Sequence, residues 1–171
     1  MQREDDLLVL RPPVQADLQA LFEIHGDPRT NRFNPHGPMQ SLQAAQALLD
    51  RLGAHWAEHG FGYWMVALRA APERALGIGG LIEKEVPGCQ GLNLYYRFRP
   101  EAWGRGLASA MGRRAIAFAD TVLGRRHDVF ARVRPDNQPS IRVLERLGLV
   151  QVGLTQDEAP PLPPSLLYRL R

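Results

Sequence analysis

The chain has 171 residues, which fits one folded domain (residues 1–171) that buries a substantial core without covalent staples. Hydrophobic residues make up 44% of it and charged residues 23%, as in globular proteins. The formal net charge of +3 and the scattered arginines argue against nucleic acid and suit an anionic ligand. The single Cys89 excludes an internal disulfide, and neither a membrane span nor a signal peptide is visible, so we expect a cytoplasmic protein.

The first third of the chain is predicted to form a strand and two helices. Residues 7–11 are an apolar run stopped by prolines, which is typical of a strand. Apolar residues recur at three- and four-residue steps in residues 17–25, and again from the N-cap Ser41 to about Gly60, which indicates helices. Proline and glycine in residues 31–38 predict a loop between the two helices.

Three strands are predicted next, at residues 63–68, 75–82 and 92–98. The connecting segments, residues 71–74 and 87–88, are short enough for antiparallel hairpins.

The second half begins with a helix from Leu107, followed by a strand at residues 129–133. Because one strand–helix–strand crossover joins this strand to residues 92–98, the two should run parallel. A helix is predicted from Pro139 to Gly148. Two closing strands at residues 150–154 and 166–170, joined by a proline-rich linker at residues 159–164, complete the chain. The predicted fold class is α/β, with a mixed, mostly antiparallel sheet of about seven strands and helices on both faces.

A glycine turn connects the strand at residues 92–98 to the helix from Leu107. Its sequence is Trp103-Gly104-Arg105-Gly106-Leu107-Ala108. The first N–H groups of a helix have no partner within the helix, and the helix dipole is positive there. Because glycine has no Cβ, a phosphate group is able to approach this backbone closely. The turn is therefore predicted to bind an anion.

Several other phosphate and catalytic motifs are excluded. No Gly-Lys-Ser/Thr follows the turn, and no Gly-x-Ser-x-Gly elbow is present. A dinucleotide fingerprint needs a third small residue where Ser109 stands, and it follows the first strand of a parallel unit instead of hairpins. His55 and His59 share a helical spacing but have no evident third ligand, so we expect no metal.

A second polar junction, residues 137–140, follows the strand at residues 129–133. Both junctions lie at the carboxyl ends of adjacent parallel strands, where open sheets bind ligands. If these strands diverge, an elongated cofactor fits between them, with its phosphates on the amides of residues 104–108.

These two motifs resemble those of the GNAT superfamily of N-acetyltransferases, over nearly the whole chain. The closest branch contains the enzymes that acetylate the N-terminal alanine of ribosomal proteins. The motifs that carry the resemblance are Pro100-Glu101-Ala102-Trp103-Gly104-Arg105-Gly106-Leu107-Ala108 and Asn137-Gln138-Pro139-Ser140-Ile141-Arg142-Val143-Leu144-Glu145-Arg146-Leu147-Gly148-Leu149.

The resemblance implies that the sheet is split into a V between its two central parallel strands and that acetyl-CoA is the acetyl donor. It implies pyrophosphate binding by the amides of residues 103–108, and a pantetheine and thioester that face Asn137 and Ser140. The cofactor-binding residues expected from it are Phe98, Trp103, Gly104, Arg105, Gly106, Leu107, Ala108, Asn137 and Ser140.

The sequence departs from the family pattern at three places. Trp103 stands where many members have Gln or Arg, which should not disturb a loop that acts through its backbone. Asn93 occupies the position of a glutamate that serves as general base, and an amide takes no proton at neutral pH. The tyrosine that some members place after the second helix is missing beyond Leu149.

The expected reaction is direct attack by a primary amine in a ternary complex. The candidate catalytic residues are Ser140, as a donor to the sulfur, and Glu83, as a base; each has a structural alternative, as a helix-start and a solvated strand-end residue. Phe33, Asn93 and Tyr95 are expected to line the acceptor site. The acceptor is a protein N-terminus or a small-molecule amine, and the protein is a monomer or a homodimer. A catalytically silent acyl-CoA sensor and a nucleotide-dependent oxidoreductase are the alternative functions.

Overall fold

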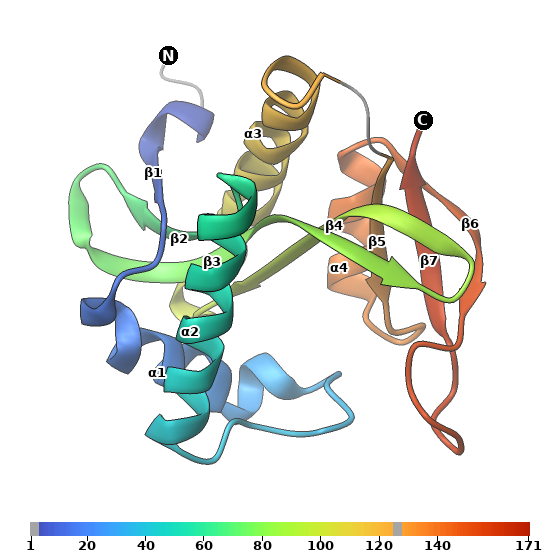
Figure 1. Cartoon of the computed structure of the whole chain (residues 1–171), viewed down its shortest axis with the longest axis horizontal. Coiled ribbons are helices and arrows are strands. Elements are labelled where there is room, and N and C mark those ends of the chain that lie inside the picture. Colours follow the sequence, from blue (N-terminus) through green and yellow to red (C-terminus); the bar gives the residue numbers. More distant parts are fainter. Residues whose placement is uncertain (1–3, 125–127) are drawn as a thin grey trace.

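The computed structural model describes residues 4–124 and 128–171, so His127 and its two predecessors in the polar break lie outside the described residues (Figure 1). Within these ranges the chain forms seven strands, four α-helices and four short 3-10 turns. In chain order they are η1 (Glu4–Leu7), β1 (Leu8–Arg11), η2 (Gln15–Asp17), α1 (Leu18–Gly26), η3 (Pro28–Asn31), α2 (Leu42–His59), β2 (Tyr63–Leu68), β3 (Ala71–Val86), β4 (Cys89–Phe98), η4 (Pro100–Ala102), α3 (Leu107–Thr121), β5 (Val129–Val133), α4 (Gln138–Arg146), β6 (Leu149–Thr155) and β7 (Ser165–Leu170).

The seven strands form one sheet in the order β1-β2-β3-β4-β5-β7-β6. β4 and β5 run parallel, and every other neighbouring pair is antiparallel. The crossover through α3 therefore has the direction that the sequence predicted.

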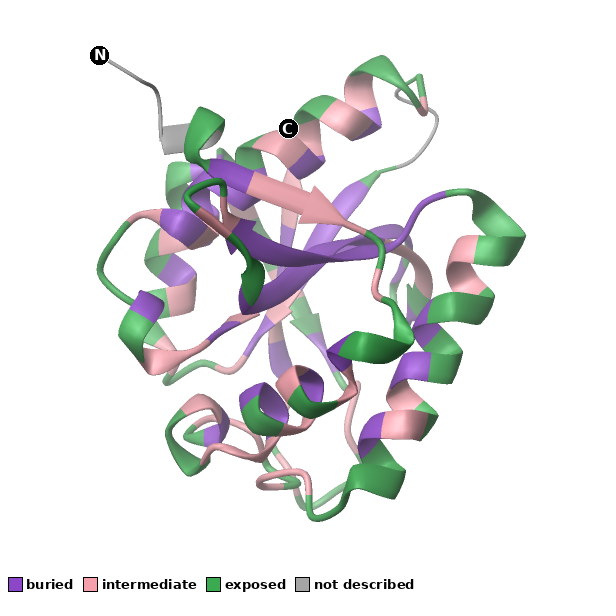
Figure 2. Ribbon diagram, turned by 90° about the vertical axis from the view of Figure 1, so that its left-hand side faces the viewer, coloured by how far each residue is buried: buried purple, intermediate pink, exposed green. Residues whose placement is uncertain are grey.

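Helices cover both faces of the sheet. α1 and α2 pack one apolar cluster, which includes Leu21, Ile24 and Leu49, against one face. α3 and α4 pack the larger cluster, with Met111 and Leu144, against the other face. Figure 2 shows the buried residues concentrated in the central strands and on the inward sides of the helices. The predicted fold class is therefore confirmed.

The predicted helix ends are visible in α2. Ser41 is its N-cap, and the Ser41 hydroxyl accepts a hydrogen bond from the backbone N–H of Ala44 at 3.1 Å. At the other end Gly60 adopts a left-handed conformation with φ of 73°, which stops the helix after His59.

β3 is longer than the sequence predicted. The segment 71–74 was expected to be a loop, but β3 begins at Ala71, which lies opposite Leu68. The pairing of β2 with β3 shifts register on both sides of Ala67, so an irregular edge accommodates Pro72. The hairpin at residues 87–88, in contrast, lies where it was predicted.

α3 and α4 approach closely at a glycine. A Cβ on Gly112 of α3 would lie 2.4 Å from the Leu147 Cδ1 that follows α4. Glycine therefore lets the two segments pack closely, because a Cβ here would force the Leu147 side chain to move. This contact fixes α4 against the helix that follows the glycine turn.

Candidate functional site

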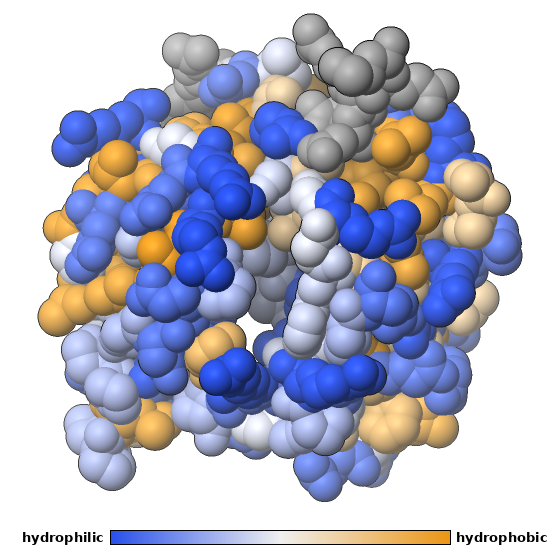
Figure 3. All heavy atoms as spheres, turned by 180° about the vertical axis from the view of Figure 1, so that it is seen from behind, coloured by the Kyte–Doolittle hydropathy of each residue, from blue (hydrophilic) through white to orange (hydrophobic). Residues whose placement is uncertain are grey.

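β4 and β5 separate after a short stretch of pairing. Leu92 pairs with Val129 and Asn93 with Phe130, whereas β3 pairs with β4 from Cys89 to Phe98. Beyond Asn93 the edge of β4 that faces β5 has no strand partner among the described residues. The space-filling view from behind shows a deep hollow near the middle of the molecule (Figure 3). The predicted split between the two parallel strands is therefore confirmed.

The loop after β4 enters α3 through two glycines with left-handed backbone. Gly104 has φ of 71°, and Gly106, the N-cap of α3, has φ of 73°. A Cβ on Gly104 would meet no atom within 4 Å. Gly106 supplies no side-chain cap for the first N–H groups of this 15-residue helix. These donors and the positive end of the dipole therefore lie beside open space, as a phosphate site requires.

The other residues predicted around this loop have distinct environments. The half-exposed Trp103 folds back, and its Nε1 donates to the carbonyl of Phe98 at 2.9 Å. The Phe98 ring is buried in the core, so only the Phe98 backbone lies at the loop. Arg105 is exposed, Leu107 is buried and Ala108 is half-buried.

The start of α4 is tied to β4 across the split. The Asn137 side chain caps α4 by accepting a hydrogen bond from the backbone N–H of Ser140 at 3.2 Å. The Tyr96 hydroxyl donates to the carbonyl of Ser140 at 3.1 Å. Burial raises the pKa of Tyr96, so this hydroxyl keeps its proton. Two hydrogen bonds therefore hold the backbone of the half-buried Ser140 in place at the start of α4.

Alternate residues of β4 define a polar floor on the α1–α2 face. The Asn93 side chain donates to the Tyr63 hydroxyl at 2.9 Å, and the ring centroids of Tyr63 and Tyr95 lie 5.1 Å apart. Because side chains alternate along a strand, Asn93 and Tyr95 share this face. The structure thus brings these two predicted acceptor residues together. Phe33 lies on the loop between α1 and α2, where the Arg32 guanidinium is 5.3 Å from its ring.

A buried histidine supports the polar floor from α1. His25 Nδ1 lies 2.9 Å from the carbonyl oxygen of Leu21, which assigns its proton to Nδ1, and His25 Nε2 lies 3.4 Å from the Tyr95 hydroxyl. Burial, and next the charge of Arg97, lower the pKa of His25 to about 4. Asn31 joins the same cluster, since it accepts from Arg97 Nη1 at 2.9 Å and donates to the carbonyl of His25 at 2.7 Å. No local pattern in the sequence indicates this long-range cluster.

Glu83 lies on the opposite face of the sheet from Asn93. Glu83 is in register with Leu92, whereas Ile82 is in register with Asn93. Leu92 belongs to the apolar cluster under α3, so Glu83 points toward that side. The structure therefore does not bring Glu83 together with the polar floor.

The two histidines with helical spacing have a structural role. His55 Nδ1 bonds the carbonyl of Phe61 at 2.9 Å, and His55 Nε2 accepts from the backbone N–H of Glu83 at 3.1 Å. The His55 and His59 rings stack with centroids 4.3 Å apart. Both nitrogens of His55 are thus occupied. Across the described ranges, no three His, Cys, Asp or Glu side chains gather as a metal site.

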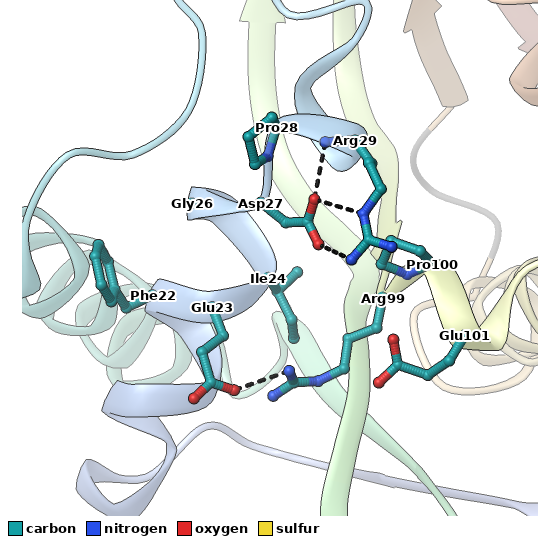
Figure 4. Close-up of a pocket in the computed structure, with 10 residues that line it drawn as sticks. All are labelled: Phe22, Glu23, Ile24, Gly26, Asp27, Pro28, Arg29, Arg99, Pro100 and Glu101. Atoms are coloured by element: carbon teal, nitrogen blue, oxygen red, sulfur yellow. Dashed lines mark hydrogen bonds and ion pairs between the residues drawn. The ribbon is translucent and has the colours of Figure 1, made fainter.

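A shallow cavity of about 710 Å³ lies between the end of α1 and η4 (Figure 4). Its charged side chains are paired, as Glu23 bonds Arg99 at 2.8 Å, Asp27 bonds Arg29 at 2.6 Å, and Glu101 bonds Arg74 at 3.1 Å. A hydrogen bond from Arg29 holds the pKa of Asp27 below its usual value. The cavity lies just before the glycine turn. Because its acidic and basic side chains offset one another, it favours neither an anionic nor a cationic ligand.

An ion pair that the sequence did not predict lies on the far side of the split. Arg132 Nη1 of β5 donates to Asp157 Oδ2, in the loop between β6 and β7, at 2.7 Å. The Ser165 hydroxyl donates to the same oxygen at 3.1 Å. The Asp157 side chain is only 7% exposed. Nothing in the local sequence marks it, because its partner is 25 residues away.

A mixed sheet that opens between two parallel strands, beside an uncapped helix start, defines a class of proteins that bind an elongated phosphate-bearing ligand in the split. Sequence comparison then identifies the family. The sequence model described as an acetyltransferase (GNAT) domain matches residues 8–150, so the chain belongs to the GNAT acetyltransferases. It is therefore an acetyl-CoA-dependent acyltransferase, and the resemblance found in its motifs is confirmed at the level of the superfamily.

Known proteins support this assignment. The chain is 25% identical to the uncharacterized N-acetyltransferase YoaA of Bacillus subtilis (strain 168) over 153 residues, which cover 88% of this chain and 84% of YoaA. Its fold is similar to an acetyltransferase from Agrobacterium tumefaciens str. C58, with a TM-score of 0.78, 24% identity and coverage of 100% and 93% of the two chains. It is also similar to spermidine N-acetyltransferase from Vibrio cholerae in complex with CoA and spermine, with a TM-score of 0.74, 19% identity and coverage of 96% and 94%.

These comparisons do not single out the branch that acetylates ribosomal proteins. None of the helices in the described ranges combines the length and the apolar character needed to cross a membrane.

Proposed function

We propose that the chain transfers an acetyl group from acetyl-CoA to a primary amine, with both substrates bound together in the split between β4 and β5. The observation that carries this proposal is the uncapped start of α3, reached through Gly104 and Gly106 directly after the strand with the free edge. In this proposal the N–H groups of residues 103–108 hold the pyrophosphate of acetyl-CoA. The free edge of β4 supplies hydrogen bonds to the pantetheine amides.

The proposed chemistry is one displacement. The lone pair of the amine attacks the acetyl carbon, a C–N bond forms, the C–S bond breaks, and the amine proton passes through water to the departing thiolate. Backbone N–H groups on the free edge of β4 polarise the carbonyl, and the Ser140 hydroxyl donates to the sulfur. Since Glu83 lies on the other face and Asn93 is not basic, water is the proton carrier in this mechanism.

The acceptor class rests on two kinds of support. The similarity to a spermidine acetyltransferase supports a small-molecule amine, and the motif resemblance to the ribosomal-protein branch supports a protein N-terminus. Either acceptor would reach the polar floor of Tyr63, Asn93 and Tyr95 from the side of the α1–α2 loop, which includes Phe33.

The test is a measurement of thiol release from acetyl-CoA with a panel of primary amines, beside calorimetry of acetyl-CoA binding. We expect tight binding and acetylation of at least one amine class. Binding without turnover across a broad panel would instead support a silent acyl-CoA sensor. Absence of acetyl-CoA binding would refute both functions.

The role of Ser140 has a separate test. Ser140→Ala removes the proposed donor to the sulfur but leaves the backbone N–H and carbonyl bonds of that residue. We expect kcat to fall roughly 10- to 100-fold, which is the loss of one hydrogen bond in the transition state, with little change in acetyl-CoA affinity. An unchanged kcat would remove Ser140 from the mechanism.

We also propose that residues 1–171 form one acyltransferase domain, as a monomer or homodimer in the cytoplasm. The family match over residues 8–150 supports the first part. The lone Cys89, which is buried and reduced, suits the second. The proposal involves no metal, nucleic acid or membrane.

A further inference from the structure

Arg97 is a half-buried arginine on the polar floor of the split. Because side chains alternate along β4, Arg97 shares the face of Asn93 and Tyr95. It lies in the part of β4 that no longer pairs with β5, in register with Ile78 of β3. Its side chain folds back toward Tyr95, with Cζ 6.0 Å from the centroid of the Tyr95 ring. The guanidinium therefore lies over the polar floor.

The charge of Arg97 has no carboxylate partner within residues 4–124 and 128–171. Its Nη1 donates instead to the amide oxygen of Asn31 at 2.9 Å. Arg11, Arg99 and Arg132 are also half-buried, and each of them forms an ion pair with a carboxylate. Withdrawing a cation from water costs free energy unless an anion or hydrogen bonds compensate. The position of Arg97 therefore suits an anion that comes from outside the chain.

Three side chains next to the guanidinium are neutral at pH 7. Burial, and next the charge of Arg97, lower the pKa of His25 to about 4. Burial raises the pKa of Tyr95, so its hydroxyl keeps its proton. Asn31 has an amide, which is held in turn by its bonds to the carbonyl groups of His25 and Asp27 at 2.7 Å and 2.8 Å. These neighbours position the guanidinium without neutralising it.

The guanidinium keeps donors that a ligand is able to reach. It carries five N–H groups on three nitrogens, and Nη1 is the nitrogen that bonds Asn31. Nε and Nη2 of Arg97 make no well-formed hydrogen bond within the described part of the chain, and neither is one of its fully buried atoms without a partner. Both nitrogens therefore remain open to solvent. Together they form the side of the guanidinium that binds both oxygens of a carboxylate.

The distance from the guanidinium to the reaction centre selects the length of the acceptor. In the proposed function, the pantetheine runs from the glycine turn back along the free edge of β4, so the acetyl group lies near Asn93, where the two strands meet. Arg97 follows Asn93 by four residues, and its side chain folds back over Tyr95, which lies between them. The guanidinium is therefore about 7 Å along the strand from Asn93. An α-amino acid is too short for this gap, whereas several methylene groups between the amine and the carboxylate span it.

We propose that Arg97 binds a carboxylate of the acceptor, and that the acceptor is a primary amine with this carboxylate several bonds away, as in an ω-amino carboxylate. This inference rests on the proposed function and narrows its substrate class. One guanidinium matches one carboxylate, whereas a polyamine would bring further cations beside Arg97 and Lys84. Lys84 shares this face, because it is in register with Gly91, two residues from Asn93. Arg97 binds and orients the acceptor, and the bonds that form and break are those of the displacement described above.

The first experiment needs no variant. γ-Aminobutyrate and butylamine are primary amines of similar length that differ in the carboxylate, glycine carries the carboxylate next to the amine, and spermidine represents the polyamines. We expect kcat/KM for γ-aminobutyrate to exceed that for butylamine by roughly 100-fold, because a site built to bind a polar group rejects an analogue without it. Equal values for these two amines, or a preference for glycine or spermidine, would overturn the inference.

Two variants then assign the contact. Arg97→Lys keeps the positive charge but removes the two parallel donors, so KM for γ-aminobutyrate should rise roughly 10-fold while KM for butylamine stays unchanged. Arg97→Gln also removes the charge and should raise the first value further. The half-buried Arg11, which pairs with Asp17 on β1, provides the matched control, and Arg11→Lys should change neither value. Equal effects of Arg97→Lys on both amines, together with a lowered melting temperature, would show that Arg97 only supports Asn31 and would overturn the inference.

Acetyl-CoA affinity separates this inference from the proposed function. All three variants should bind acetyl-CoA like the wild type. If acetyl-CoA binds but no amine is acetylated, the proposed function fails at its chemical step. Calorimetry with γ-aminobutyrate and butylamine then still decides the role of Arg97. Tighter binding of γ-aminobutyrate, lost in Arg97→Gln, supports it, and equal binding of the two amines refutes it.

Discussion

Substituting Gly104 by alanine measures the contribution of the glycine turn to donor binding. Gly104 has φ of 71°, so a Cβ costs about 1 kcal/mol of left-handed strain, which lowers the melting temperature by roughly 2–4 °C in a protein of this size. Within the protein that Cβ meets no atom within 4 Å. Any loss of acetyl-CoA affinity must therefore arise from contact between this Cβ and the bound ligand. We expect the Kd for acetyl-CoA to rise roughly 10-fold, equivalent to about 1.4 kcal/mol.

Gly60→Ala is the matched control for this measurement. Gly60 has φ of 73° at the end of α2, and a Cβ there also meets no atom within 4 Å. Thermal unfolding and calorimetry should show the same loss of stability in both variants and a loss of acetyl-CoA affinity in Gly104→Ala alone. Equal affinities of the two variants for acetyl-CoA would refute the phosphate role of the turn.

Three further predictions concern stability. Above pH 6.5 His25 is neutral in both the folded and the unfolded state and does not change stability. As the pH falls toward the folded-state pKa of about 4, the unfolded state binds the proton first, so the free energy of unfolding declines by up to about 1.4 kcal/mol per pH unit. His25→Gln should remove this slope in denaturant unfolding. Tyr96→Phe deletes the bond between β4 and α4 and should lower the free energy of unfolding by about 1 kcal/mol. Gly112→Ala forces a Cβ into the contact between α3 and α4 and should cost about 1–3 kcal/mol.

Each of these variants has a reference. The buried Tyr168 makes no side-chain hydrogen bond within the described residues, so Tyr168→Phe should be nearly neutral. Equal losses of stability at both tyrosines would contradict the role given to Tyr96. Gly53 lies within α2 with open space around it, so Gly53→Ala should stabilise by about 0.5–1 kcal/mol. If the free energy of unfolding still declines with falling pH in His25→Gln, this pH dependence arises from other groups.

Local patterns carried most of the fold. Ser41 and Gly60 mark the ends of α2 because capping and left-handed stops are local chemistry, and the crossover rule gave the direction of β5. Local patterns also predicted a loop at residues 71–74, because the proline suggested a turn. In the structure this segment belongs to β3, and its irregular pairing with β2 accommodates the proline.

The candidate site could be predicted only in part. The glycine turn and the start of α4 are contiguous motifs, so the sequence shows them. The face of Glu83 depends on the register of β3 with β4, and a slip of one residue would reverse it. The cluster around His25 and the pair of Arg132 with Asp157 join segments far apart in the chain, which single-sequence patterns do not connect.

The early separation of β4 from β5 also bears on how the protein avoids aggregation. An unpaired strand edge is a template for pairing with another chain, and soluble proteins usually blunt it with charges, prolines or bulges. The edge of β4 from Leu94 to Phe98 contains no proline. It faces inward across the split, where a second protein strand cannot align along it. A narrow, extended molecule is the partner that such an edge still admits, so the geometry that shields the edge from other chains also reserves it for a ligand.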